Sequence, residues 1–187
     1  MEEDKKFFLK YYQELSAQIT NIDSEQLEKA IDILRKAKNN GNTIYICGNG
    51  GSASTSEHWA NDLMKIAGVK AQSLTTLPLI TAYGNDISYE SIFVEQLKIL
   101  MKEGDVVIGI TGSGNSPNIV SALGYALQNG GIPLAILGFN GGKIINMNVP
   151  FILIKSRDYG IIEDMHLSLG HVFAKILGGK DVVVEIN

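Results

Sequence analysis

Histidines and carboxylates occur together at helical spacing in two short segments, and these segments contain all three histidines of the chain. His58 and Asp62 stand at positions i and i+4, while Glu163 and His166 stand at i and i+3, with His171 further along. Residues three or four apart share one face of a helix, so each segment can present an imidazole beside a carboxylate. Such groups transfer protons or bind a divalent ion. The pattern therefore predicts acid–base or metal chemistry.

Each of these pairs also has a purely structural interpretation. His58 and Asp62 could form an ion pair on the surface of a helix. His171 lies in an apolar stretch, where a polar side chain needs a partner, and alone it would be read as a satisfied core histidine. For His166 a core or surface role is the better interpretation. Because every histidine falls in these two segments, we favour function for His58 and His171.

Two loops rich in glycine and serine, 48–52 and 111–116, each follow an apolar run and begin a helical pattern. Glycine lets the backbone approach an anion, and the free N–H groups and dipole of a helix N-terminus attract negative charge. Serine and glycine are also ordinary N-cap residues. Two such loops after neighbouring strands nevertheless favour an anion site. The residues expected to bind there are Asn49, Gly50, Gly51, Ser52, Thr111, Ser113, Asn115 and Ser116.

Several classes of ligand are disfavoured by the sequence. Neither loop contains the Gly-Lys-Ser/Thr of a P-loop or the Gly-x-Gly-x-x-Gly dinucleotide fingerprint, so we expect a small sugar phosphate and no nucleotide cofactor. The net charge of −4 and the lack of a Lys/Arg cluster argue against nucleic acid.

No apolar stretch is long enough to cross a membrane, and the charged N-terminus lacks a signal core. We therefore expect a cytoplasmic protein, with Cys47 a buried, inert thiol.

The alternation of apolar runs and helical patterns predicts a doubly wound α/β fold. The apolar runs are continuous, as expected for parallel strands covered on both faces. The expected strands are Thr43–Cys47, Ala71–Leu74, Val106–Ile110, Leu134–Leu137 and Phe151–Ile154.

Helical patterns precede, separate and follow these runs. The expected helices are 4–19, Ser24–Asn39, Ser52–Ile66, Ile87–Lys102, Pro117–Asn129 and Glu163–Leu177. The first has a broad apolar stripe that either contacts another subunit or packs on its own domain. The tail Asp181–Asn187 could add an edge strand.

Four motifs resemble the SIS (sugar isomerase) family, and within it the phosphoheptose isomerases. These motifs are Cys47-Gly-Asn-Gly-Gly-Ser52 with His58, Gly84-Asn85-Asp86, Ser113-Gly-Asn-Ser116-Pro-Asn, and Glu163-Asp-Met-His166 with His171. The resemblance implies a three-layer SIS fold with a five-stranded parallel sheet flanked by helices. It implies one SIS domain over 1–187, with an N-terminal helical extension (1–40), an α/β core (41–178) and a tail (179–187). It also implies a homotetramer with N-terminal helices in oligomer contact and active sites at subunit interfaces.

The same resemblance implies a ketose–aldose isomerase acting on sedoheptulose 7-phosphate through an enediol(ate), in surface polysaccharide synthesis. Asp62, on the His58 helix, would take the proton, with His171 as its acid–base counterpart. One Zn²⁺ or similar ion could be held by His58, Asp62, Glu163 and His171. Ser52, Ser113 and Ser116 correspond to phosphate-binding serines, and Asn49 and Asp86 to groups that orient sugar hydroxyls.

Three departures from the family pattern qualify this expectation. The family usually has Glu at position 62 and Gln at 163, and an Arg-Tyr pair where this chain has Lys65-Ile66-Ala67. Asp is one methylene shorter than Glu, so Glu163 could compensate as the base or as a metal ligand. The alternatives are an isomerase for another sugar phosphate and a non-catalytic relative that binds the bacterial replication initiator.

Overall fold

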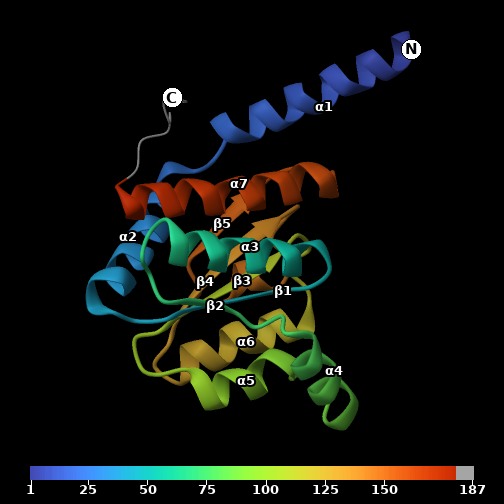
Figure 1. Cartoon of the computed structure of the whole chain (residues 1–187). Helices are drawn as coiled ribbons and strands as arrows, with labels where there is room; N and C mark the ends of the chain where they lie inside the picture. Colours follow the sequence, from blue (N-terminus) through green and yellow to red (C-terminus); the bar gives the residue numbers. More distant parts are fainter. Residues whose placement is uncertain (180–187) are drawn as a thin grey trace.

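The computed structural model describes residues 1–179 and has three layers, with a parallel sheet between two layers of helices (Figure 1). The sheet has five strands in the order β2-β1-β3-β4-β5, all paired in parallel. The strands are β1 (Ile44–Gly48), β2 (Ala71–Ser73), β3 (Val106–Thr111), β4 (Ile132–Gly138) and β5 (Phe151–Ile154). The predicted fold class is therefore confirmed, and every predicted strand overlaps an observed one.

Burial on both faces explains why the strand sequences are apolar throughout rather than alternating. All residues of β1 and β3 are buried. Gly48 at the end of β1 pairs with Ile110 of β3, and Thr111 pairs with Leu137 of β4. The loops that follow these three strands consequently open at the same edge of the sheet, where open α/β sheets bind ligands.

Helices α2, α3 and α7 cover one face of the sheet, and α5 and α6 cover the other (Figure 1). Helix α1 crosses α7 and extends beyond the body of the molecule. The helices are α1 (Glu2–Thr20), α2 (Ser24–Asn40), α3 (Gly51–Lys65), α4 (Leu77–Asp86), α5 (Ile92–Leu100), α6 (Pro117–Gln128) and α7 (Tyr159–Gly178). A 3₁₀ turn, Ile144–Asn146, lies between β4 and β5.

Two helix predictions were wrong in their bounds. The helix expected over Ile87–Lys102 begins only at Ile92, and a separate helix, α4, precedes it. None of the residues of α4 is buried, so the sequence had no core-facing stripe to reveal it. Helix α7 begins before Glu163, because the Asp158 side chain caps it by accepting a hydrogen bond from the Ile161 amide.

Two further expectations can be compared with the described residues, and a third cannot. Cys47 is fully buried, and burial raises the pKa of its thiol to about 12, as expected of an inert core residue. Among residues 1–179, no helix is both long and apolar enough to cross a bilayer. The edge strand considered for Asp181–Asn187 lies outside the described residues.

Candidate active site

The loops after β1 and β3, together with the start of α7, line a cavity of about 170 Å³ at the carboxyl edge of the sheet. We call this cavity the anion pocket. The residues that line it are Asn49, Ser52, Ile110, Thr111, Gly112, Ser113, Ser116, Tyr159 and Glu163. Five of the predicted anion-binding residues are thus brought together, four of them with hydroxyl groups. Gly50 and Gly51 form the adjoining start of α3, whose N-terminus faces this edge.

Close backbone packing explains why the second loop needs glycine. Gly114 has a positive φ of 63°, and a Cβ atom there would overlap the carbonyl of Gly141 in the loop after β4. The Gly114 carbonyl also accepts hydrogen bonds from the amides of Lys143 and Ile144. The loop after β4 therefore supports the loop that carries Ser113 and Ser116.

Asn49 is fixed by two residues for which no role was predicted, although one of them, Asn118, ends a motif of the family. Its side-chain amide exchanges two hydrogen bonds of 2.9 Å with the amide of Asn118, on α6. The Tyr89 hydroxyl also donates to Asn49 Oδ1, at 3.0 Å. Nothing in the spacing of these residues indicated the contacts, because they join segments far apart in the chain. Tyr159, at the start of α7, was missed for the same reason.

Two predicted binding residues, Asp86 and Asn115, lie outside the lining of the anion pocket. Asp86, at the end of α4, is exposed, accepts a hydrogen bond from Asn85, and is not among the residues that line the anion pocket. Asn115 is also exposed and hydrogen-bonds within its own loop and to the Lys143 amide. Asn115 therefore supports the loop instead of lining the cavity.

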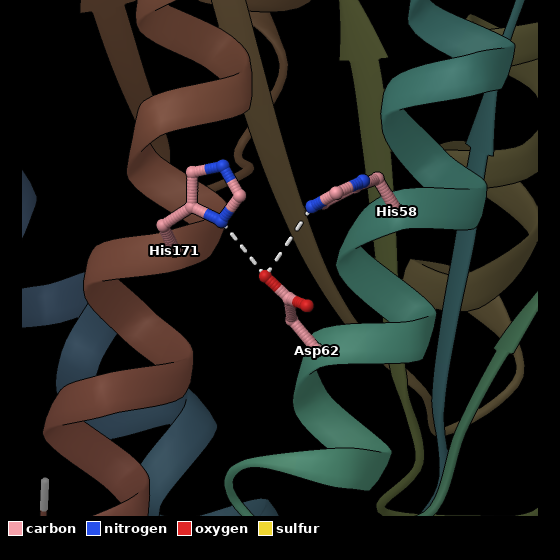
Figure 2. Close-up of side chains that lie close together, drawn as sticks. All are labelled: His58, Asp62 and His171. Atoms are coloured by element: carbon pink, nitrogen blue, oxygen red, sulfur yellow. Dashed lines mark hydrogen bonds and ion pairs between the residues drawn. The ribbon is translucent and has the colours of Figure 1, made fainter. Parts of the chain in front are cut away.

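His58 and Asp62 of α3 meet His171 of α7 beyond the anion pocket (Figure 2). His171 Nδ1 lies 2.8 Å from Asp62 Oδ2, and His58 Nε2 lies 3.5 Å from the same oxygen. The two imidazole rings are nearly perpendicular, with centroids 4.8 Å apart. A carboxylate can only accept, so Nδ1–H of His171 donates and Nε2 of this ring stays available. Asp62 is buried, whereas both histidines are about half exposed.

The structure corrects the setting expected for His171. Its sequence neighbours Val172 and Ile176 are exposed, so His171 lies on the open side of α7 and not in apolar surroundings. Its polar partner is Asp62. By contrast, His166 is buried, lies 3.1 Å through Nε2 from the Leu137 carbonyl oxygen, and has a pKa lowered to about 4 by burial. The core interpretation of His166 is thus confirmed.

A glycine and a tryptophan set the spacing of the two helices that carry this cluster. Trp59, next to His58, is completely buried, and its indole N–H donates to the His166 carbonyl. A Cβ atom on Gly170, next to His171, would overlap the Trp59 indole ring. The absence of that Cβ lets α7 approach α3 closely enough for His171 to reach Asp62.

Glu163 is not part of the cluster formed by His58, Asp62 and His171. Its carboxylate lines the anion pocket instead and lies against the backbone of Gly51. The three clustered residues offer two imidazole nitrogens and one carboxylate oxygen within 4.8 Å of one another. This donor set suits Zn²⁺, which takes three protein ligands in catalytic sites. The residues present therefore fit a divalent ion.

Comparison with known proteins assigns the chain to a protein family. A family model described as the SIS domain matches residues 7–138, more than half of the chain. The chain therefore belongs to the SIS domain family, which confirms the resemblance drawn from its motifs.

Similar curated proteins narrow the assignment. Phosphoheptose isomerase of Aliarcobacter butzleri is 36% identical, with 90% of this chain and 93% of that protein aligned. Phosphoheptose isomerase of Aquifex aeolicus is 33% identical, with 99% and 98% aligned. Within the SIS family, the chain therefore falls among the phosphoheptose isomerases.

A solved structure supports the same placement. Phosphoheptose isomerase GmhA from Neisseria gonorrhoeae has a TM-score of 0.86 at 28% identity, covering 95% of this chain and 98% of that one.

Proposed function

We propose that the protein is an aldose–ketose isomerase that interconverts sedoheptulose 7-phosphate and D-glycero-D-manno-heptose 7-phosphate. One observation carries the proposal. Asp62 lies on α3, the helix that begins at the anion pocket, and its carboxylate lies between the imidazoles of His58 and His171. Asp62 and His58 lie roughly two to three turns along α3 from Ser52. A sugar phosphate held by its phosphate at Ser52 can therefore extend its carbonyl end toward Asp62.

The reaction moves one proton between C1 and C2 of the sugar. In our proposal Asp62 removes a proton from C1 of the ketose, and the electron pair left on carbon forms the enediol(ate) as the C2 carbonyl opens. His171, protonated at both ring nitrogens, donates its Nε2 proton to the C2 oxygen. Asp62 returns the carbon-bound proton to C2, and His171 Nε2 takes up the proton lost from the C1 hydroxyl, which gives the aldose and restores both groups. The hydrogen bond from His171 to Asp62 orients both groups for this exchange.

His58, Asp62 and His171 are the residues that would hold a divalent ion, with Glu163 as a fourth ligand. When bound, the ion would supply the positive charge that stabilises the C2 oxygen, in place of the proton from His171. Zn²⁺ is the ion we propose, because imidazole nitrogen and carboxylate oxygen are its common ligands. If Glu163 does not bind the ion, it is the alternative base for the proton at C1.

The anion pocket would hold the phosphate of the substrate. Thr111 and three serines, Ser52, Ser113 and Ser116, offer hydroxyl donors, and the backbone of Gly50 and Gly51 offers the N-terminus of α3. We assign Asn49 and Asp86 to the sugar hydroxyls and Asn115 to the support of the phosphate. For Asp86 this assignment requires that the end of α4 approaches the bound sugar.

We also propose that the protein is a homotetramer with α1 in the subunit contacts. Only one residue of α1, Gln18, is buried. Several large apolar side chains of this helix are exposed, namely Phe7, Phe8, Leu9, Tyr12 and Ile19. Apolar surface of this extent is typical of a helix that packs on another chain. Light scattering coupled to size exclusion would measure the mass, and a monomer would contradict this part of the proposal.

A different sugar phosphate is the second candidate, because Asp62 is a shorter carboxylate than the Glu usual in the family. A non-catalytic role in binding the replication initiator is disfavoured, since a scaffold has no need of a paired His58 and His171. The cytoplasmic location and a role in surface polysaccharide synthesis remain predictions.

The test is to follow sedoheptulose 7-phosphate by NMR with the purified protein, in parallel with added Zn²⁺ and with a chelator. We expect signals of the aldoheptose phosphate to appear, and to appear more slowly with the chelator. If the heptose is unchanged in every arm while another ketose phosphate is converted, the second candidate is correct. If neither the heptose phosphate nor any other ketose phosphate is converted, the isomerase proposal is contradicted.

A further inference from the structure

The anion pocket contains a carboxylate of the protein itself. A Cβ atom on Gly51 would lie 2.8 Å from both carboxylate oxygens of Glu163, so this group lies against the first residue of α3. The N-terminus of a helix is the place where an anion is most favoured. Glu163 thus occupies the position that the sequence and the fold offer to a phosphate.

The charges around the pocket mean that the Glu163 carboxylate would oppose the binding of a phosphate. None of the residues that line it is Lys or Arg, and Glu163 is the one acidic side chain among them. A phosphate that entered beside Glu163 would meet like charge at close range without a lining cation to offset it. The cavity, at about 170 Å³, leaves little room for the two groups to separate.

The Glu163 side chain can also turn toward the cluster formed by His58, Asp62 and His171. Side chains on a helix lean toward its N-terminus, which directs Glu163 toward Gly51. His171 lies eight residues further along α7, about 12 Å along the helix axis. This separation is within the combined reach of an extended glutamate and a histidine that share one ion. A turn of the Glu163 side chain toward His171 would therefore clear the pocket.

We propose that Glu163 is an internal competitor of the phosphate that leaves the pocket when it joins His58, Asp62 and His171 around a divalent ion. Binding of the ion then raises the affinity for phosphate, and binding of phosphate raises the affinity for the ion by the same factor. The inference rests on the proposed function, because it takes the pocket as the phosphate site and the cluster as the ion site.

The test measures binding, not turnover. Inorganic phosphate is titrated calorimetrically into metal-free protein as the wild type, as Glu163→Gln and as Asp164→Asn. Asp164 is the next residue on α7, and it is exposed and outside the pocket. Its substitution therefore removes one negative charge from the protein without changing the lining of the pocket. Its amide oxygen can still accept the hydrogen bond from Tyr11. The titrations are repeated with protein loaded with one equivalent of Zn²⁺ and freed of excess ion.

We expect metal-free Glu163→Gln to bind phosphate about tenfold more tightly than the wild type and Asp164→Asn, a gain of about 1.4 kcal/mol. Zn²⁺ should tighten phosphate binding in the wild type and in Asp164→Asn by a larger factor than in Glu163→Gln. Equal phosphate affinities in all three metal-free proteins would overturn the inference while leaving the phosphate site in place. Failure of every protein to bind phosphate, with and without Zn²⁺, would overturn the inference and the proposed phosphate site together.

Discussion

The anion pocket and the His58–Asp62–His171 cluster are built in different ways, although helix α3 contributes to both. The hydrogen-bond donors of the pocket are loop backbone and short hydroxyl side chains at the ends of β1 and β3, two strands that pair directly, and Tyr159 and Glu163 of α7 complete its lining. The cluster is made of side chains on α3 and α7, which are far apart in the chain. Local sequence therefore specifies the donor groups of the pocket, whereas the whole cluster depends on how closely two helices pack.

This difference predicts distinct consequences of substitution in the two regions. Changes in the cluster should affect the rate of the chemical step, and changes in the pocket should affect the binding of substrate. Changes at the contact between Trp59 and Gly170 should affect the cluster and leave the hydroxyl groups of the pocket in place, because these groups come from the loops and the start of α3.

The largest effect is expected at Asp62. We expect Asp62→Asn to lower kcat by about 10³-fold, because the amide cannot take up a proton. His171→Gln should have a comparable effect, and both variants should keep the wild-type assembly. Steady-state kinetics on the heptose phosphate would measure this. The matched control is Glu57→Gln, an exposed carboxylate on the same helix. Wild-type turnover in both cluster variants would refute the roles given to these residues.

Gly170→Ala tests the contact that sets the cluster. The added methyl group would overlap Trp59 and push α7 away from α3, and a misplacement of about 1 Å can cost about 10²-fold in rate. We expect kcat to fall by that order while phosphate binding is retained. The control is Gly124→Ala on α6, where an added Cβ has only an ordinary contact with Met147. Equal kinetics for the two variants would show that the contact does not position the cluster.

Helix α7 carries a second histidine that should affect stability without affecting the chemistry. Burial lowers the pKa of His166 to about 4, below its value of about 6.5 in an unfolded chain. The unfolded state therefore binds the proton more readily, and stability falls as the pH drops from about 6.5 to about 4. We expect this residue to account for a loss of about 2 kcal/mol in unfolding free energy between pH 8 and pH 5.

Urea unfolding at these two pH values would measure the loss, with His166→Gln as the comparison. The variant should lose less stability on acidification than the wild type. The same acid loss in both proteins would mean that other groups control the pH dependence.

The smallest effect is expected in the pocket, where several donors share the phosphate. Ser52→Ala should raise KM about tenfold, the usual effect of losing one hydrogen bond to a charged group, with little change in kcat. Ser54→Ala is the control, because Ser54 is exposed on the first turn of the same helix and does not line the pocket. A fall in kcat without a change in KM would place Ser52 in the chemical step and remove the contrast between the two regions.

The outcomes of the sequence predictions follow the same division. The strands and the two glycine-rich loops were predictable because continuous apolar runs and helix-opening glycines are local signals. The i, i+4 relation of His58 and Asp62 was local too. By contrast, Asn118 and Tyr89 around Asn49, and the fit of Trp59 against Gly170, arise from tertiary packing that no spacing reveals. Glu163 lies in the pocket because of how α7 packs beside the start of α3, which its motif alone did not indicate.

Solvent hydrogen exchange is the most direct test of the central claim, that Asp62 and His171 act on a sugar whose phosphate lies in the pocket. Sedoheptulose 7-phosphate would be incubated in D₂O with the wild type, Asp62→Asn and Ser52→Ala, and deuterium at C1 followed by NMR. We predict exchange with the wild type, none above background with Asp62→Asn, and exchange with Ser52→Ala that recovers at high substrate concentration. Undiminished exchange with Asp62→Asn would contradict the account.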